Sequence, residues 1–329
     1  MPRLNAFLLV FLMTTFTAAG ETSLNPATDA VYSGSPPLQL TDDVPYEKFN
    51  RPWPDGSKIL FTCERDATHY DIFTVPTDGS MVKTKISPGD GSYDHADVNP
   101  AGTHICYCVG ADTNSEWEIA VLELGGSETV ITNNAASGWD SNCPTYNGDG
   151  SKIAYVKVDW DTHVGKIVVV DTDGSNEIEI CTINGAANMI YGMDWLGNDN
   201  VLVYTTNGGG LKKVTATAGS TPTAVDTSEI YHVCHVNSDG SKIAASCADG
   251  AHQKYVSINP DGTGKVVIVD RETFLPFFSN FWCMLCWTAD DAGIIVLATE
   301  DGVNQDIYLV TSFTNVEPSS LGSLKTRFR

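Results

Sequence analysis

Basic residues are scarce in this sequence. Its 329 residues include 19 lysines and arginines against 41 aspartates and glutamates, and the formal net charge is −22 at pH 7. Nucleic acids and anionic membrane surfaces are bound mainly through Lys and Arg side chains that replace counterions. The charge therefore argues against a nucleic-acid partner. It favours solubility in an exported protein, a basic partner or bound divalent cations.

Sequence motifs of the common catalytic sites are also absent. The chain has no Gly-x-Ser-x-Gly, no His-Glu-x-x-His and no glycine-rich phosphate-binding loop. No segment of the repeated region shows the period of about 3.6 residues that is typical of a helix. These absences weaken the case for an enzyme without excluding one, because some active sites are assembled from residues distant in the sequence.

Long apolar runs are missing except at the N-terminus. Arg3 precedes an apolar run over residues 6–16, and small residues follow at 18–20. This order is that of a secretory signal peptide cleaved before Glu21, and the run is shorter than the ~20 residues of a membrane-spanning helix. We expect a secreted or periplasmic protein with no transmembrane segment in the mature chain. A short membrane anchor and a mistaken start are the alternatives.

The nine cysteines are an odd number, so at least one thiol has no partner within the chain. Cys234 and Cys247 flank a hairpin at similar distances, and either a cross-strand disulfide or two free thiols would fit there. Cys283 and Cys286 have the spacing of a redox motif. That chemistry uses a helix N-terminus, whereas this segment has the pattern of a strand, so buried thiols or structural disulfides are expected.

A five-residue turn sequence reveals an internal repeat. Asp-Gly-Ser-Lys-Ile occurs at 55–59, 149–153 and 239–243, and weaker copies occur at 101–105, 198–201 and 290–294. Glycine supplies the positive φ of a tight hairpin between two β-rich segments. The six units recur at intervals of roughly 40 to 52 residues, which is the length of a four-stranded propeller blade.

Each unit offers four strands, and a single such sheet cannot bury both of its faces. The sequence therefore predicts an all-β fold, a six-bladed β-propeller with four-stranded antiparallel blades. The segment 37–41 is expected to close the last blade beside a strand that ends near Val310. The aromatic residues before the turns are expected to pack between blades rather than to stack on sugars; they are Trp53, Tyr146, Trp195 and Trp287.

The predicted domain organisation follows from these segments. We expect a signal peptide at 1–20, a flexible linker at 21–36, the propeller at 37–313 and a C-terminal tail at 314–329.

The repeat resembles that of TolB-like propellers. Residues 146–155 read Tyr-Asn-Gly-Asp-Gly-Ser-Lys-Ile-Ala-Tyr, and residues 167–175 contain the second apolar strand and its Asp-Gly turn. The TolB-type pattern is Trp-Ser-Pro-Asp-Gly-x-Lys-Ile-Ala-Phe followed by such a strand. The resemblance covers almost the whole mature chain and implies the propeller fold. The α/β domain that precedes the propeller in TolB has no counterpart in 21–36.

A weaker resemblance is to oligogalacturonate lyases, propellers that hold a divalent metal with histidines of late blades. Residues 231–240 resemble one ligand-bearing blade, but 280–287 lack the histidine-rich segment expected in the last one. The resemblance implies a divalent cation as the candidate cofactor, and this departure argues against it, because one histidine seldom suffices.

Polar residues gather where the inner strands would approach the propeller axis. Carboxylates and imidazoles from different blades can converge there on a cation or a polar ligand. His232 and His235 are three residues apart, so on a regular strand they face opposite sides and cannot chelate one ion without a bulge. The candidate axial ligands are Asp94, His95, Asp97, Asp140, Asp194, His232 and His235.

These observations favour a binding scaffold that presents one face to a protein or glycan partner. The rival hypothesis is a carbohydrate-active enzyme, a lyase or a hydrolase, with an axial Asp/His site. Loss of activity in His95→Ala or His232→Ala would separate the two.

Overall fold

The computed structural model describes residues 36–42, 46–185, 190–197, 200–206, 210–249, 252–270, 280–299 and 305–311. The segments expected to be the signal peptide and the C-terminal tail lie outside these residues. In the described part, the only helix is the 3-10 turn η1 (Ala135–Ser137), and no helix there has the length and apolar character needed to cross a membrane.

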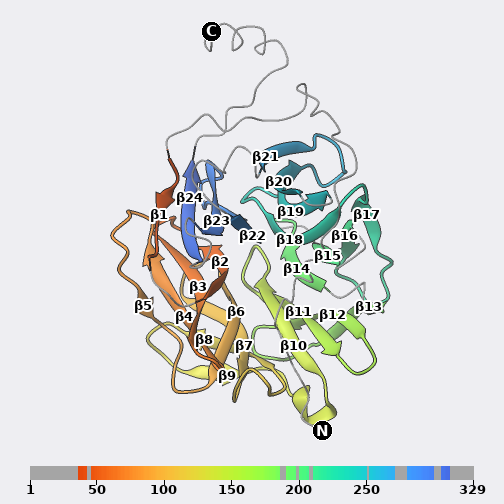
Figure 1. Ribbon diagram of the computed structural model, residues 1–329. Helices are drawn as coiled ribbons and strands as arrows, with labels where there is room; N and C mark the ends of the chain where they lie inside the picture. Colours follow the sequence, from red (N-terminus) through yellow and green to blue (C-terminus); the bar gives the residue numbers. More distant parts are fainter. Residues whose placement is uncertain are drawn as a thin grey trace, which may run out of the picture.

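Six four-stranded antiparallel sheets form the blades, which follow one another around a common centre in Figure 1. Blade 1 contains β2 (Glu47–Pro52), β3 (Lys58–Asp66), β4 (His69–Pro76) and β5 (Thr84–Lys85). Blade 2 contains β6 (Ser92–Val98), β7 (His104–Gly110), β8 (Glu118–Glu123) and β9 (Glu128–Val130). Blade 3 contains β10 (Asp140–Tyr146), β11 (Lys152–Asp159), β12 (Val164–Asp171) and β13 (Ile178–Asn184).

The second half of the chain repeats the plan. Blade 4 contains β14 (Ile190–Trp195), β15 (Val201–Thr206), β16 (Gly210–Thr215) and β17 (Thr223–Asp226). Blade 5 contains β18 (Ile230–Val236), β19 (Ile243–Asp249), β20 (His252–Ile258) and β21 (Val266–Asp270). Blade 6 contains β22 (Asn280–Trp287), β23 (Gly293–Thr299) and β24 (Asp306–Thr311). The predicted six-bladed propeller is confirmed.

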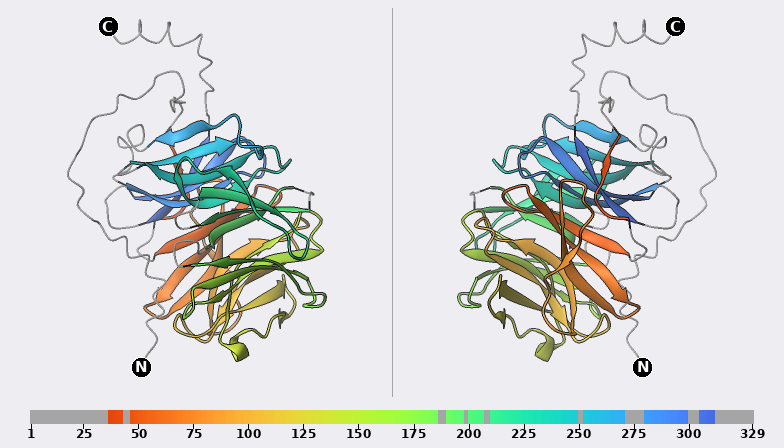
Figure 2. Two further views of the ribbon diagram at one scale, coloured as in Figure 1. Left: turned by 90° about the vertical axis from the view of Figure 1, so that its right-hand side faces the viewer. Right: turned by 90° about the vertical axis from the view of Figure 1, so that its left-hand side faces the viewer.

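Blade 6 takes its fourth strand from the start of the described chain. Strand β1 (Leu38–Gln39) pairs antiparallel with β24, and Leu38 lies opposite Leu309. Figure 2 shows β1 beside the blue strands of the last blade. The side chain of Thr41 fastens this closure, because its hydroxyl donates to Glu47 Oε2 at 2.5 Å and accepts from the Ile307 amide at 2.8 Å. The prediction that the N-terminal strand closes the ring is therefore confirmed.

The Asp-Gly repeats form the turns between the first two strands of a blade. In the first copy, the Ser57 amide donates to Asp55 Oδ1 at 2.9 Å, and Gly56 has φ +73°. The copies at Asp149 and Asp239 make the same contact, at 2.9 and 2.8 Å. A side-chain oxygen that caps its own turn explains why Asp precedes the glycine.

The core consists of six apolar clusters, and each lies between two neighbouring blades. The four aromatic residues expected to pack there do so, because each is at most 8% exposed and belongs to one of these clusters. Burying an aromatic side chain of this size stabilises the fold by a few kcal/mol. Each blade therefore buries its apolar faces against the neighbouring blades.

Each inner strand contains a β-bulge shortly before or at its ring-forming end. The pairing between the first two strands shifts register between Lys48 and Arg51 in blade 1 and at the corresponding positions of blades 2 and 3, and one or two residues away from there in blades 4, 5 and 6. A bulge bends the strand and re-aims the side chains beside it. The bulges therefore decide which residues face the axis.

Candidate functional site

Six side chains, one from each inner strand, surround the propeller axis. Each lies two positions before the residue whose amide closes the following hairpin, for example Trp53, which donates to Lys58 O at 2.8 Å. We call this set the axial ring, and it consists of Arg51, Asp97, Thr145, Asp194, His235 and Cys286. The inner strands contact each other in sequence, and β22 contacts β2, so the ring is closed.

Members of the axial ring contact one another, both between neighbouring blades and across the ring. The Arg51 guanidinium lies 3.8 Å from Asp97 Oδ1 and 3.7 Å from Asp194 Oδ2. The Thr145 hydroxyl lies 3.0 Å from Asp97 Oδ2 and 3.3 Å from Asp194 Oδ1. His235 Nε2 lies 3.6 Å from Asp194 Oδ2. The positive charge of Arg51 therefore lies between two carboxylates from different blades.

Three ring members also accept an amide hydrogen from the next blade. The Tyr146 amide donates to Asp97 Oδ2 at 2.8 Å, and the Val236 amide donates to Asp194 Oδ2 at 2.8 Å. The Trp287 amide donates to His235 Nδ1 at 3.2 Å. The donors stand at the same position in their blades, one residue after the ring position. These bonds join successive blades, and we call them inter-blade amide bonds.

Burial and Arg51 together determine the protonation of the axial ring. Burial raises the pKa of Asp97 and of Asp194, and Arg51 offsets only part of this rise. Burial lowers the pKa of His235 well below its ordinary value, and the nearby Arg51 lowers it further. His235 is therefore neutral at pH 7, and its Nδ1 accepts the Trp287 amide while Nε2 carries the proton.

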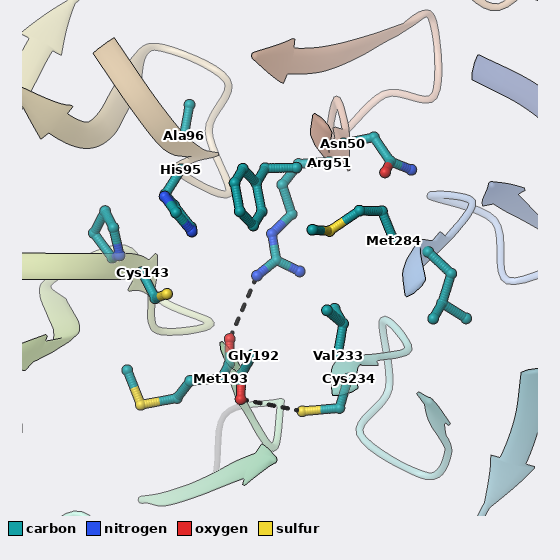
Figure 3. Close-up of a pocket in the computed structure, with 13 residues that line it drawn as sticks. Asn50, Arg51, His95, Ala96, Cys143, Gly192, Met193, Val233, Cys234 and Met284 are labelled. Atoms are coloured by element: carbon teal, nitrogen blue, oxygen red, sulfur yellow. Dashed lines mark hydrogen bonds between the residues drawn. The ribbon is translucent and has the colours of Figure 1, made fainter. Parts of the chain in front are cut away.

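A pocket opens on one side of the axial ring, and Figure 3 shows its lining. Apart from Arg51, the lining consists of the two residues that precede the ring position in each of the six inner strands. The cavity measures about 40 Å³, which is room for a few water molecules or a small functional group. Apolar side chains, two thiols, His95 and the guanidinium of Arg51 form its surface. We call it the axial pocket.

Of the seven predicted site residues, only His95 lines the axial pocket. Its Nδ1 lies 3.5 Å from Asp94 Oδ2, and Lys48 Nζ donates to the same oxygen at 2.7 Å. Burial would raise the pKa of Asp94, but the charges of Lys48 and His95 outweigh it, so the net shift is downward. Asp94 is therefore an ionised, buried carboxylate between two basic groups.

The predicted residues Asp97, Asp194 and His235 meet in the axial ring, whereas Asp140 and His232 make their contacts elsewhere. Asp140 accepts from the Trp117 amide at 2.9 Å and from the indole of Trp160, both within blades 2 and 3. The His232 carbonyl accepts from the Thr205 hydroxyl at 2.5 Å. A β-bulge lies between Tyr231 and Cys234. Chelation of one ion by His232 and His235 would require such a bulge, but of the two histidines only His235 is a member of the axial ring.

Comparison with family models found no match, and comparison with curated proteins found none either. Solved structures do resemble this chain. An oligogalacturonate lyase in complex with manganese is 13% identical, with a TM-score of 0.59, over 88% of this chain and 96% of the lyase. A gluconolactonase from Xanthomonas campestris is 10% identical, with a TM-score of 0.60, over 88% and 99%. TolB from Acinetobacter baumannii is 14% identical, with a TM-score of 0.55, over 81% and 64%.

The chain shares the propeller fold of these proteins. At these identities the likeness shows the fold alone. The resemblance to TolB and to oligogalacturonate lyase propellers expected from the repeat is thus supported at the level of architecture. This chain spans 64% of the Acinetobacter TolB protein. The comparisons include both TolB and enzymes, so they leave the activity open.

A divalent cation does not fit the axial ring. The guanidinium of Arg51 occupies the position between Asp97 and Asp194 where a cation would be held. Among the residues whose placement is described, no three His, Cys, Asp or Glu side chains are grouped so that they could bind a metal. The cation that the lyase resemblance implied therefore finds no ligand set in this part of the chain.

The eight cysteines whose side chains the structure describes are free thiols, and seven of these eight are buried. Cys234 and Cys247 are not bridged, because Cys247 lies opposite Tyr231 and Cys234 lies opposite Ala245. Cys283 and Cys286 lie on strand β22, as predicted. Cys143 is the one described cysteine that is only partly buried, and it lines the axial pocket.

Three members of the axial ring and one thiol of the axial pocket were not among the predicted residues. They are Arg51, Cys143, Thr145 and Cys286. A signal for the ring members was present, because each ring residue stands four positions before the first residue of the turn motif, as Arg51 does before Asp55 and His235 before Asp239. Aligning the repeats on their turns finds the whole ring.

Proposed function

We propose that this chain is a secreted or periplasmic binding propeller that presents one face to a protein or glycan partner. The observation that carries the proposal is the use of the axial acids as structural groups. Asp97 accepts from the Tyr146 amide and the Thr145 hydroxyl, and Asp194 accepts from the Val236 amide. Acid–base chemistry by these carboxylates would compete with the bonds that hold the blades together.

The face at which the inner strands begin offers a contact patch for a glycan. Trp139 directly precedes β10, and Lys157 Nζ and Lys166 Nζ lie 5.8 and 5.2 Å from the centre of its ring. The two lysines are cross-strand partners, an arrangement of like charges that is usually unfavourable. Glu179 balances Lys166 at 2.8 Å. An aromatic ring beside clustered ammonium groups favours a sugar that carries a carboxylate, so we propose an acidic glycan.

Calorimetric titration with oligogalacturonate tests this proposal. We expect binding without turnover, and a loss of at least about tenfold in affinity in Trp139→Ala, since removing one stacked ring costs on the order of 1.4 kcal/mol. Lys212→Ala on blade 4 is the matched control, because Lys212 is a half-buried strand lysine in another blade and should leave affinity unchanged. Equal affinity in wild type and Trp139→Ala would remove the patch from the proposal.

The second candidate is a carbohydrate-active enzyme. It is favoured by the fold shared with a lyase and a lactonase and by the presence of His95 and Arg51 in the axial pocket. A lyase that eliminates across a uronate would create a double bond that absorbs in the ultraviolet. Under the binding proposal no such absorbance develops. If it does, and if His95→Ala abolishes it while His232→Ala does not, the enzyme hypothesis replaces the binding one.

A further inference from the structure

One member of the axial ring reaches into the axial pocket. Among the residues described as the lining of this cavity, Arg51 is the only ring residue. Figure 3 shows its guanidinium in the middle of the lining side chains. Asp97 and Asp194, its charged partners in the ring, are not part of the lining. The guanidinium therefore has carboxylates on its ring side and an open cavity on its pocket side.

The hydrogen-bonding capacity of the Arg51 side chain is little used. In the described part of the chain, its one hydrogen bond runs from Nη2 to the Met193 carbonyl and is long, at 3.4 Å. The carboxylate oxygens of Asp97 and Asp194 lie 3.8 and 3.7 Å away, which is beyond hydrogen-bond distance. The Arg51 side chain is only 17% exposed, and buried donors without an acceptor are costly. An acceptor in the pocket would satisfy them.

The charges around the pocket favour an anion as this acceptor. The chain has 41 acidic residues against 19 basic ones, yet its described lining contains two basic side chains, Arg51 and His95, and no Asp or Glu. Burial alone would lower the pKa of His95, but the charges around it outweigh burial, and the net shift is upward. Burial raises the pKa of Asp97 and of Asp194, so these carboxyls take up a proton more readily when an anion approaches Arg51.

The walls of the pocket are mainly apolar, and strained backbone holds three of the lining side chains in place. Phe49, His95 and Cys143 have φ of +53°, +49° and +53°, and each stands two positions before its axial-ring residue. Left-handed φ outside glycine is uncommon, and such strain gathers at binding sites where side chains must be aimed. Met193 and Val233 add apolar surface. The cavity of about 40 Å³ has room for about three or four non-hydrogen atoms.

We propose that the axial pocket binds a short-chain carboxylate, about the size of acetate, through the guanidinium of Arg51. The planar fork of N–H groups matches the two oxygens of a carboxylate, and such charged, bidentate pairs are stronger than neutral hydrogen bonds. The alkyl group of the ligand lies against the apolar walls. A spherical anion cannot use the fork in this way, and a neutral amide lacks the charge.

A titration with ¹³C-labelled acetate, followed by NMR, measures the binding directly. At pH 6 and constant ionic strength, we expect one site with a dissociation constant on the order of 1 mM, as a ligand this small can reach. Acetamide has the shape of acetate without the charge and should bind at least about tenfold more weakly. Chloride at equal concentration should not displace acetate. Equal binding of acetate and acetamide, or displacement by equimolar chloride, overturns the carboxylate assignment.

Arg51→Met tests the anchor. The variant loses the charged, bidentate contact and should bind acetate at least about tenfold more weakly. Arg65→Met is the matched control, because Arg65 also lies in blade 1 beside carboxylates but does not line the pocket, and it should leave the affinity unchanged. Wild-type affinity in Arg51→Met would show that acetate binds elsewhere, and the proposal would be abandoned.

A second variant tests the cavity without altering the ring. Cys143 is partly exposed and lines the pocket, so Cys143→Met places a longer side chain in the space of the ligand. We expect at least an about tenfold loss of acetate affinity. Cys181→Met, the same substitution in the outer strand of the same blade, is the control and should bind as wild type does. If Arg51→Met does not fold, this pair decides, and equal affinity in both variants contradicts the proposal.

The proposal does not rest on the binding function suggested above, because Trp139 is not part of the described pocket lining. Trp139→Ala should leave the affinity for acetate unchanged. Failure of oligogalacturonate to bind, together with acetate binding that depends on Arg51, would leave this inference intact. The reverse result would leave the binding function intact.

Discussion

Three side chains at the axis join successive blades by accepting a backbone amide hydrogen. Two of them are carboxylates, Asp97 and Asp194, and the third is the imidazole of His235. Each takes the amide hydrogen of the residue that follows the ring position in the next blade. A buried amide without an acceptor costs about 1–3 kcal/mol, so an acceptor at this position stabilises the junction between two blades. The other three ring members, Arg51, Thr145 and Cys286, show no such bond to the next blade among the hydrogen bonds described.

The ion pair between Lys48 and Asp94 gives a pH-dependent contribution to stability. Both side chains are at most 5% exposed, and removing one partner of a buried pair costs about 3 kcal/mol. The pKa of Asp94 is lowered in the folded state, so its contribution is complete above the unfolded pKa of about 3.9 and is lost as the pH falls below it. Asp94→Asn should therefore be less stable than wild type at pH 7.

Urea unfolding at pH 7, 5 and 3 checks this prediction. The deficit of Asp94→Asn should be equal at pH 7 and 5 and should shrink at pH 3, where the wild-type carboxyl begins to lose its advantage. Asp149→Asn is the control, because Asp149 lies in an exposed turn. A deficit that stays constant down to pH 3 would show that the charge of Asp94 does not stabilise the fold.

Part of the site could be predicted from the residue types alone. Asp97, Asp194 and His235 could be predicted because carboxylates and imidazoles are common ligand-binding groups, and these three residues do meet at the axis. Arg51 was missed because a single arginine in an acidic chain carries no ligand pattern. Cys143 was missed because a bulge, rather than the strand period, turns it toward the axis. Strand alternation cannot place side chains next to a bulge.

Among the elements, the two-residue strand β1 and the residue Thr41 that follows it contribute to the closure of the ring. Thr41, just beyond it, joins blade 6 to blade 1 through a hydroxyl that is almost fully buried. Thr41→Val would leave the Ile307 amide and one Glu47 oxygen without this partner. We expect a loss of about 2 kcal/mol in the free energy of unfolding, measured with urea.

Thr62→Val is the matched control for this experiment. Thr62 is fully buried in blade 1, and in the described structure its hydroxyl has no hydrogen-bond partner. Replacing it with the isosteric valine should be neutral or slightly stabilising, because no bond is lost. If the two variants lose equal stability, the closure contact has no special role.

The turns between the third and fourth strands differ in how they meet the neighbouring blade. Gly174 has φ +85°, and a Cβ there would lie 2.6 Å from the Ile131 carbonyl oxygen. Gly125, in the corresponding turn of blade 2, has φ +80° and open space around it. Both alanine variants lose about 1–2 kcal/mol from the left-handed φ. Gly174→Ala should lose a further ~1–3 kcal/mol by overpacking, seen as a lower Tm than that of Gly125→Ala.

On the scale of the whole molecule, stability is shared between neighbours. Every apolar cluster in the described structure contains residues of two blades, and the clusters run from blade to blade around the ring. A blade that unfolded alone would expose the faces of both neighbours. We therefore expect one cooperative transition, with urea midpoints that coincide for far-ultraviolet circular dichroism and tryptophan fluorescence. Two separated midpoints would show that groups of blades unfold independently.

The fold could be predicted more completely than the site. The Asp-Gly turns fixed the number and the boundaries of the repeats, because a turn depends on local chemistry that stays visible in the sequence. The closure by residues 38–39 was also predictable, since the last unit lacked a fourth strand of its own. The six positions of the axial ring can be found by aligning the repeats on their turns. Their residue types differ from blade to blade, so no shared residue type marks them as one site.

The pairing of β1 with β24 also sets the order of assembly. Leu38 and Gln39 leave the ribosome long before Leu309 and Tyr308, which are their partners in the finished sheet. The first strand must therefore wait, unpaired, until nearly the whole chain has been synthesised. A translation product that stops before β24 would keep an open ring with two uncovered blade faces, a state that chaperones and proteases can recognise.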